Sequence, residues 1–213
     1  TYSNTTHRSV KYPESLDWRE IGAVTPVRDA EAYSSAGVET IEGSYVVNFG
    51  NTLEAFSLQE IIDCSLMIND FQYVLLKDGK MCLDKDYPYT GKKGTCQRDD
   101  SKAVGNFNLY LTVIEGDEDD LAKKVSEKGP IKVLVDGSQA SFQLYMSGIY
   151  EERKCDPKDL NTDLCVVGYG SEGDDKYWIC KNHWSTAWGE QGYIRMIWLN
   201  NQCGIASQGS GIH

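Results

Sequence analysis

The stretch that decides the fold is Lys181-Asn182-His183-Trp184-Ser185-Thr186-Ala187-Trp188-Gly189-Glu190-Gln191-Gly192-Tyr193. It joins two segments rich in β-branched and aromatic residues, 176–182 and 192–197, which we predict to be strands. The same composition predicts strands over 131–135 and 165–169. The second half of the chain is therefore expected to be mainly β-structure.

The first half of the chain shows helical spacing instead. The apolar residues Val38, Ile41 and Tyr45 recur on one face and predict a helix over 35–47. Ser57-Leu58-Gln59-Glu60 is a capping box, in which the serine and glutamate side chains each satisfy a backbone N–H at the start of a helix. Further helices are predicted over 69–76 and 117–128, the latter with acids at its N-terminus and Gly129-Pro130 at its end. Together these patterns predict an α+β protein with two lobes.

Charge and composition exclude several classes of function. The chain has 213 residues, a net charge of −11 and 40% hydrophobic residues, as expected for a globular protein. An acidic surface disfavours nucleic acid, because phosphate binding needs clustered Lys and Arg. No apolar run approaches the roughly 20 residues of a membrane span, and no Cys/His spacing indicates a metal site. We expect no nucleic acid, no membrane span, no metal and no cofactor.

Several short motifs occur in a fixed order along nearly the whole chain, from about Tyr12 to Ser207. In that order and spacing the chain resembles the papain family of cysteine proteases, and its cathepsin L-like members in particular. The blocks that carry the resemblance are Leu16-Asp17-Trp18-Arg19, Gly22-Ala23-Val24-Thr25-Pro26-Val27, Ser57-Leu58-Gln59-Glu60, Tyr87-Pro88-Tyr89, Val167-Gly168-Tyr169-Gly170, the stretch that begins at Asn182, and Gln202-Cys203-Gly204-Ile205-Ala206.

The resemblance implies a papain-like two-lobe fold, with a helical left lobe, a β-barrel right lobe and a cleft between them. Residues 1–11 would form an N-terminal arm and 12–213 the papain-like domain. Within that domain, about 21–105 would be the mainly helical lobe and about 106–213 the mainly β lobe, with terminal segments crossing over.

The resemblance also implies where catalytic groups should lie, and most of these positions have changed. The family's oxyanion glutamine falls at Ala30, and the block with the nucleophilic cysteine is contracted into Glu31–Ser34. The family's histidine falls in the slot Thr162–Leu164, which contains Asp163. Asn182 is retained, and His183 follows it where the family usually has serine. The glycine-rich substrate-binding loop expected after Cys64 contains no glycine.

Other residues could in principle supply chemistry. Ser34 or Ser35 could replace the nucleophile, His183 could act as a base, and Cys165 or Cys180 could be a relocated thiol. We prefer structural roles for all of them. The serines are expected to be the N-cap and first-turn residue of the helix, and the two cysteines to be buried in strands.

Seven cysteines leave at least one without an intrachain partner. The resemblance implies the disulfides Cys64–Cys96 and Cys155–Cys203, which would leave Cys82, Cys165 and Cys180 free.

From these losses we predict a protein that is not an enzyme: a catalytically inactive papain-like homologue, or pseudoprotease. It would be a structural or protein-binding component of a larger assembly, for example a cytoskeletal or flagellar one. An alternative is a secreted or vesicular pseudoenzyme that binds inhibitors or propeptides, which requires two intact disulfides. A residual cysteine-type peptidase is the distant alternative. The unpaired cysteines favour an intracellular assembly over a secreted or vesicular location.

Overall fold

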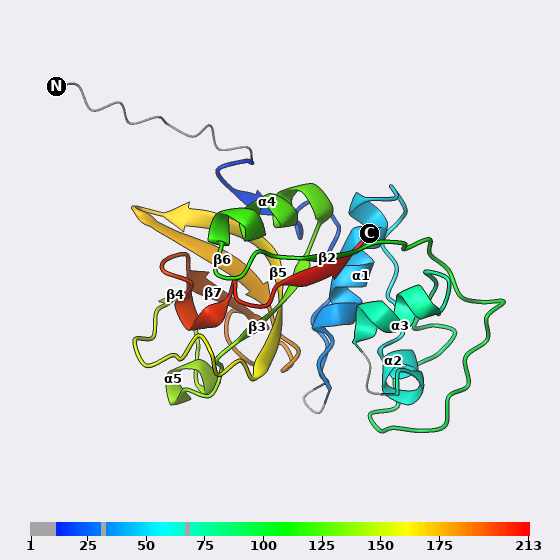
Figure 1. Cartoon of the computed structure of the whole chain (residues 1–213). Helices are drawn as coiled ribbons and strands as arrows, with labels where there is room; N and C mark the ends of the chain where they lie inside the picture. Colours follow the sequence, from blue (N-terminus) through cyan, green and yellow to red (C-terminus); the bar gives the residue numbers. More distant parts are fainter. Residues whose placement is uncertain (1–11, 31–32, 67–68) are drawn as a thin grey trace.

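The structure is a computed structural model that describes residues 12–30, 33–66 and 69–213. Figure 1 shows an α+β molecule in which three helices lie to one side of a twisted sheet. The expected N-terminal arm, 1–11, lies outside the described residues.

The helical lobe is built from α1 (Ala36–Val47), α2 (Leu58–Cys64) and α3 (Asp70–Leu76). The prediction from the capping box is only half right. The Ser57 hydroxyl accepts from the Glu60 N–H at 2.9 Å, but the Glu60 carboxylate turns inward and accepts from the Cys82 N–H and the Tyr73 hydroxyl. Glu60 therefore bonds to buried groups of other segments, and it does not bond to the Ser57 N–H as the capping box predicted.

The β lobe contains one mixed sheet with the strand order β2-β8-β3-β5-β6-β7-β4, and β1 pairs with β5. The predicted strand over 165–169 is longer than expected, because β5 runs from Thr162 to Glu172 along both β3 and β6. The strands are β1 (Leu16–Asp17), β2 (Tyr110–Thr112), β3 (Ile131–Val135), β4 (Ile149–Tyr150), β5 (Thr162–Glu172), β6 (Asp175–Lys181), β7 (Tyr193–Ile197) and β8 (Ser210–Ile212).

Helix α4 (Glu118–Lys128) covers the sheet with one apolar face, on which Leu121, Ala122 and Val125 are buried. Its N-cap is Asp117, whose carboxylate accepts from the Asp120 N–H, as the acidic start of the helix predicts. The short helix α5 (Ala140–Gln143) and the 3₁₀ turn η1 (Gln202–Gly204) complete this lobe.

Each lobe has its own apolar core, and the ends of the chain contribute to the opposite one. Trp18, near the N-terminus, packs in the core of the β lobe, whereas Ile212, near the C-terminus, packs in the core of the helical lobe. The proposed lobe boundary near 105/106 stays a prediction.

The structure contains two disulfides, Cys64–Cys96 in the helical lobe and Cys155–Cys203 in the β lobe. These are the pairs that the resemblance implied. Cys82, Cys165 and Cys180 are free and buried.

Candidate functional site

The segment before α1 lies against the loop that follows β6. The Ala30 N–H donates to the His183 carbonyl at 3.0 Å, and the Ser185 N–H donates to the Arg28 carbonyl at 3.2 Å. Ala30, at the position expected for the oxyanion glutamine, is buried by this pairing and has no side-chain donor. The contracted segment Glu31–Ser34 follows, and its residues 31 and 32 lie outside the described part of the chain.

The serines at the start of α1 match the roles predicted for them only in part. Ser35 occupies the N-cap position, but its hydroxyl donates to the Glu39 carboxylate at 3.0 Å and caps no backbone group. Ser34, one residue earlier, accepts from the Ala36 N–H at 3.4 Å. The capping oxygen therefore comes from Ser34, as expected, and the hydroxyl of Ser35 is engaged by Glu39.

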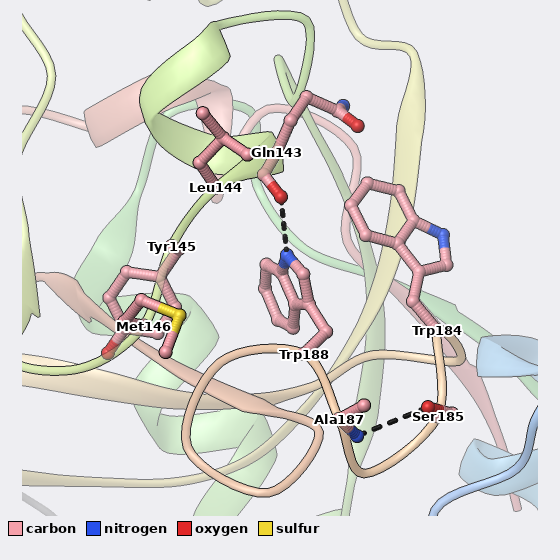
Figure 2. A pocket seen from close by; sticks show the side chains of 8 residues that line it. All are labelled: Gln143, Leu144, Tyr145, Met146, Trp184, Ser185, Ala187 and Trp188. Atoms are coloured by element: carbon pink, nitrogen blue, oxygen red, sulfur yellow. Dashed lines mark hydrogen bonds between the residues drawn. The ribbon is translucent and has the colours of Figure 1, made fainter.

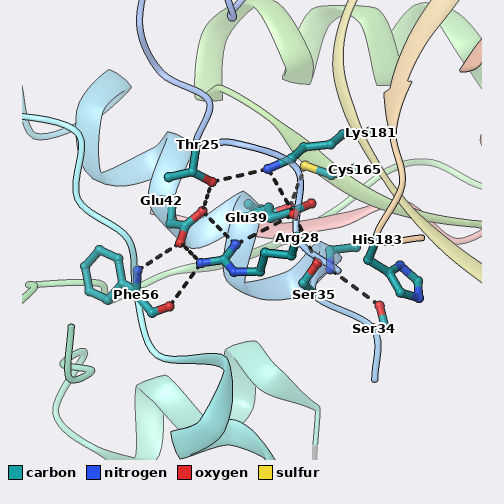
Figure 3. A network of polar contacts seen from close by, with 12 residues as sticks. Thr25, Arg28, Ser34, Ser35, Glu39, Glu42, Phe56, Cys165, Lys181 and His183 are labelled. Atoms are coloured by element: carbon teal, nitrogen blue, oxygen red, sulfur yellow. Dashed lines mark hydrogen bonds and ion pairs between the residues drawn. The ribbon is translucent and has the colours of Figure 1, made fainter. Parts of the chain in front are cut away.

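Two cations and two carboxylates form a buried network beside α1 (Figure 3). The Lys181 ammonium lies 2.9 Å from the Glu39 carboxylate, and the Arg28 guanidinium lies 2.5 Å from that of Glu42. Thr25 joins the two pairs, since its hydroxyl donates to Glu42 at 2.6 Å and accepts from Lys181 at 3.2 Å. Buried ions are tolerated when they are paired and hydrogen-bonded in this way.

Lys132, Cys165 and Lys181 are directly paired neighbours on the adjacent strands β3, β5 and β6. Directly paired residues point to the same face of a sheet, so all three side chains belong to the face that holds Glu39. The Cys165 thiol is fully buried and lies 3.6 Å from the Thr40 hydroxyl. Burial, with Glu39 nearby, raises the pKa of Cys165 well above its ordinary value, so the thiol form is favoured at neutral pH.

His183 lies at the edge of this network, with its imidazole directed away from the ion pairs in Figure 3, and it is 7% exposed. Burial lowers the pKa of His183 below its ordinary value, in spite of the opposing effect of Glu39 and Asp163. A lowered pKa leaves the imidazole neutral at pH 7, which is the form that a general base requires.

The retained Asn182 is fixed by its own neighbours. Its side-chain oxygen accepts from the His183 N–H at 2.8 Å, and its N–H donates to the Gly192 carbonyl at 2.9 Å. The buried side-chain amide nitrogen has no hydrogen-bond partner among the described residues. The nearby Trp184 and Trp188 pack edge-to-face with ring centroids 5.4 Å apart.

The slot Thr162–Leu164 lies at the start of β5. The Thr162 hydroxyl donates to the Asn161 side chain at 2.9 Å, and Leu164 is fully buried in the core of the β lobe. Asp163 instead faces Lys132, with 3.4 Å between the carboxylate and the ammonium.

Lys132 also joins the two lobes. Its ammonium lies 3.7 Å from the carboxylate of Asp70, which opens α3 in the helical lobe. A Cβ built on Gly37 of α1 would lie 2.0 Å from that carboxylate, so Asp70 rests directly on the first turn of α1. The ion triad Asp70–Lys132–Asp163 therefore connects the two lobes next to the first turn of α1.

A groove of about 630 Å³ lies beside this site (Figure 2). Leu144 and Met146, on the loop after α5, are 78% and 73% exposed. The Trp188 indole N–H donates to the Gln143 carbonyl at 3.2 Å and so holds the loop that forms the groove's other wall. The residues that line the groove are Gln143, Leu144, Tyr145, Met146, Trp184, Ser185, Ala187 and Trp188.

Sequence reasoning missed Glu39, Lys132 and Asp70. A signal was present for Lys132, because a lysine inside a predicted strand requires a partner of opposite charge. The sequence does not state which partner this is. Glu39 lies outside the predicted apolar face formed by Val38, Ile41 and Tyr45, and Asp70 lies at the start of a predicted helix, so neither gave such a signal.

A family model described as papain family cysteine protease matches residues 12–212. The chain belongs to this family. It is 40% identical to cathepsin L of Sarcophaga peregrina over 99% of its own length and 66% of that protein. The structure superposes on digestive procathepsin L2 proteinase of Tenebrio molitor with a TM-score of 0.88, at 30% identity over 96% of this chain and 69% of that one. For bromelain of Ananas comosus, in complex with the E64 inhibitor, the TM-score is 0.84 at 32% identity, over 94% of this chain and 98% of that one.

These comparisons confirm the papain-like fold. The chain spans 63–66% of the length of three curated relatives, cathepsin L of Sarcophaga peregrina, the cathepsin L-like proteinase of Fasciola hepatica and the cathepsin L-like peptidase of Aedes aegypti.

The prediction that the protein is not an enzyme is contradicted by the same comparisons. The relatives are named as cathepsin L and related proteinases. The chain also keeps a cysteine, Cys165, and a histidine, His183, beside α1. The prediction followed from the changes at Ala30, Glu31–Ser34 and Thr162–Leu164 and from the missing glycine-rich loop, and it gave Cys165 and His183 structural roles only.

Among the described residues, no group of three or more His, Cys, Asp and Glu side chains is arranged to hold a metal ion. No helix in the described part of the chain is long and apolar enough to span a membrane.

Proposed function

We propose that the protein binds extended polypeptide segments in the groove beside Trp184 and Trp188. The observation that carries this proposal is the exposure of Leu144 and Met146 on the groove's wall, 78% and 73%. Large apolar side chains are costly to leave in water, and the groove has the volume of a typical ligand site.

The groove supplies the two kinds of contact that an extended peptide needs. Its indole and aliphatic surfaces can cover apolar side chains, while the loop 184–188 offers polar backbone between them (Figure 2). This chemistry tolerates many sequences, because few polar groups in the groove would reject a particular side chain.

The two disulfides favour a partner met in an oxidising compartment, where such bonds persist. That supports a secreted or vesicular role, with inhibitor-like or propeptide-like segments as partners. A structural role in an intracellular assembly is less well supported, because it requires the same cysteines to be reduced.

The test is a titration of the full chain with oxidised insulin B chain, an extended polypeptide, followed by tryptophan fluorescence. Leu144→Ser and Met146→Ser should each weaken binding about tenfold or more, since each removes 1.5–3 kcal/mol of apolar burial. Leu76→Ser is the matched control, because Leu76 is 73% exposed at the end of α3. Equal affinities for the groove variants and the control would refute the proposal.

Peptide-bond hydrolysis is a second candidate function, favoured by the family to which the chain belongs. The thiol and imidazole available for it are those of Cys165 and His183. Because Cys165 is fully buried, the thiol must first be exposed to the substrate.

The same polypeptide serves to test hydrolysis when products are followed by mass spectrometry. This candidate expects cleavage that Cys165→Ala abolishes and Cys82→Ala preserves, since Cys82 is also a buried free thiol but lies in the helical lobe. Cleavage that survives Cys165→Ala would exclude Cys165 as the nucleophile.

A further inference from the structure

Strand β2 is an open edge of the sheet, paired only with β8. The Leu109 N–H donates to the His213 carbonyl at 2.9 Å, and the Val113 N–H donates to the Gly209 carbonyl at 2.8 Å. Because antiparallel partners bond at alternate residues, the N–H and C=O groups of Tyr110 and Thr112 point away from β8. No backbone partner for these groups occurs in the described ranges.

This edge is short, since β2 has three residues, but its side chains include none of the charges or prolines that commonly block a sheet edge. The stretch Asn108-Leu109-Tyr110-Leu111-Thr112-Val113-Ile114 contains no charged residue, proline or glycine. Leu109 and Ile114 are 52% and 62% exposed at its two ends. Natural edges are commonly blocked by lysine, proline or a bulge, so an unblocked edge is able to accept another strand.

An acidic pocket of about 530 Å³ lies where this edge ends. Ile114 belongs both to the edge and to the pocket. The indole of Trp198 forms another wall and already holds a cation, since the Lys176 ammonium lies 5.4 Å from its ring centroid. Burial raises the pKa of Glu118 above its ordinary value. A cation bound in the pocket would lower this pKa again, because it favours the charged carboxylate. The lining residues are Ile114, Glu115, Gly116, Asp117, Glu118, Asp119 and Trp198.

We infer that the β2 edge docks an extended segment of a partner protein, which adds a strand to the sheet and places a lysine or arginine side chain in the acidic pocket at its end. The open backbone groups of Tyr110 and Thr112 supply the strand pairing. The pocket supplies the specificity for a cation, and its position beside Ile114 fixes where along the segment that cation must lie.

A second copy of the chain fits this surface less well. The residues that precede the edge, Gly105-Asn106-Phe107, contain no cation to fill the pocket. The net charge of −11 also opposes association between copies.

The test uses labelled peptides of alternating valine and threonine that carry two lysines at either the amino or the carboxyl end. Matched peptides carry two glutamates instead. Fluorescence anisotropy with the full chain should show at least tenfold tighter binding for one of the lysine peptides. Glu115→Lys should remove most of this preference, because Glu115 is an exposed acid of the pocket.

Thr112→Pro removes the outward N–H and should weaken binding at least tenfold, while Thr112→Val keeps that N–H and should bind as the parent does. Proline is tolerated at a strand edge where its N–H would face solvent. Tyr110→Lys, which places a charge on the same edge, gives an independent measurement should the proline variant fold poorly.

Two results would overturn the inference. Equal affinities for the lysine and glutamate peptides would remove the role of the pocket. A dimer in sedimentation that Thr112→Pro dissociates would assign the edge to a second copy.

Discussion

The imidazole of His183 is buried near the charged groups of Glu39 and Asp163. It is 7% exposed and packs beside Trp184, with ring centroids 6.3 Å apart. Burial lowers its pKa, so the folded protein binds a proton there less readily than the unfolded chain does. The residue that sequence comparison suggested as an unusual neighbour of Asn182 is therefore a titrating group inside the fold.

The pH dependence of stability follows from that lowered pKa. Above pH 6.5, the ordinary value for the side chain, both states are neutral and the contribution of His183 is fully present. Below it the unfolded chain takes up the proton first, so the free energy of unfolding falls, by at most about 1.4 kcal/mol per pH unit for one site.

Urea unfolding of His183→Gln between pH 5 and 8 should show a shallower decline than the parent protein shows. His213 also has a pKa lowered by burial, so His213→Gln is compared in parallel and its contribution should add independently. Parallel curves for His183→Gln and the parent would show that the imidazole does not titrate on unfolding.

At the scale of elements, α1 carries charge on a face that packs against the sheet. Glu39 and Glu42 are 4% and 1% exposed, and their partners Lys181 and Arg28 come from β6 and from the segment before the helix. The helix itself was predictable from the spacing of Val38, Ile41 and Tyr45. The pairing was not, because Lys181 lies far along the chain and only the folded sheet places it beside Glu39.

Lys181→Met should destabilise the protein by about 3–5 kcal/mol, because it leaves Glu39 buried without its nearest cation. The double variant Glu39→Gln, Lys181→Met should recover much of this loss, since it removes both charges. Lys85→Met is the matched control, because its pair with Glu54 is exposed and worth less than about 1 kcal/mol. Chemical denaturation of the parent, both single variants Glu39→Gln and Lys181→Met, the double variant and Lys85→Met measures the differences. An additive double variant would show that the two side chains do not interact.

At the scale of the whole molecule, sequence patterns predicted the two lobes and most helices and strands. Local signals sufficed there: the capping residues of α2, the acidic start of α4 and the β-branched residues of β3. The ion triad beside the first turn of α1 could not be predicted from such local signals. Asp70, Lys132 and Asp163 come from α3, β3 and β5, and their meeting depends on how the lobes pack.

This triad predicts that Lys132 stabilises the contact between the lobes. Its side chain is 13% exposed and lies 3.4–3.7 Å from two carboxylates, so the interaction falls between exposed and fully buried ion pairs. Lys132→Met should therefore cost about 2 kcal/mol near pH 7. Lys102→Met, which removes a 53% exposed partner of Asp86, should cost less than about 1 kcal/mol.

The pH dependence distinguishes a lost ion pair from lost packing in Lys132→Met. Burial already raises the pKa of Asp70, and removing the neighbouring ammonium should raise it further. A carboxyl whose folded pKa exceeds its unfolded value stabilises the fold at low pH and loses that contribution as the pH rises through the folded pKa. The deficit of Lys132→Met relative to the parent should therefore shrink as the pH falls from 7 toward 4. A deficit that stays constant over this range would mean that the lysine acts through its aliphatic chain, and that charge does not join the lobes.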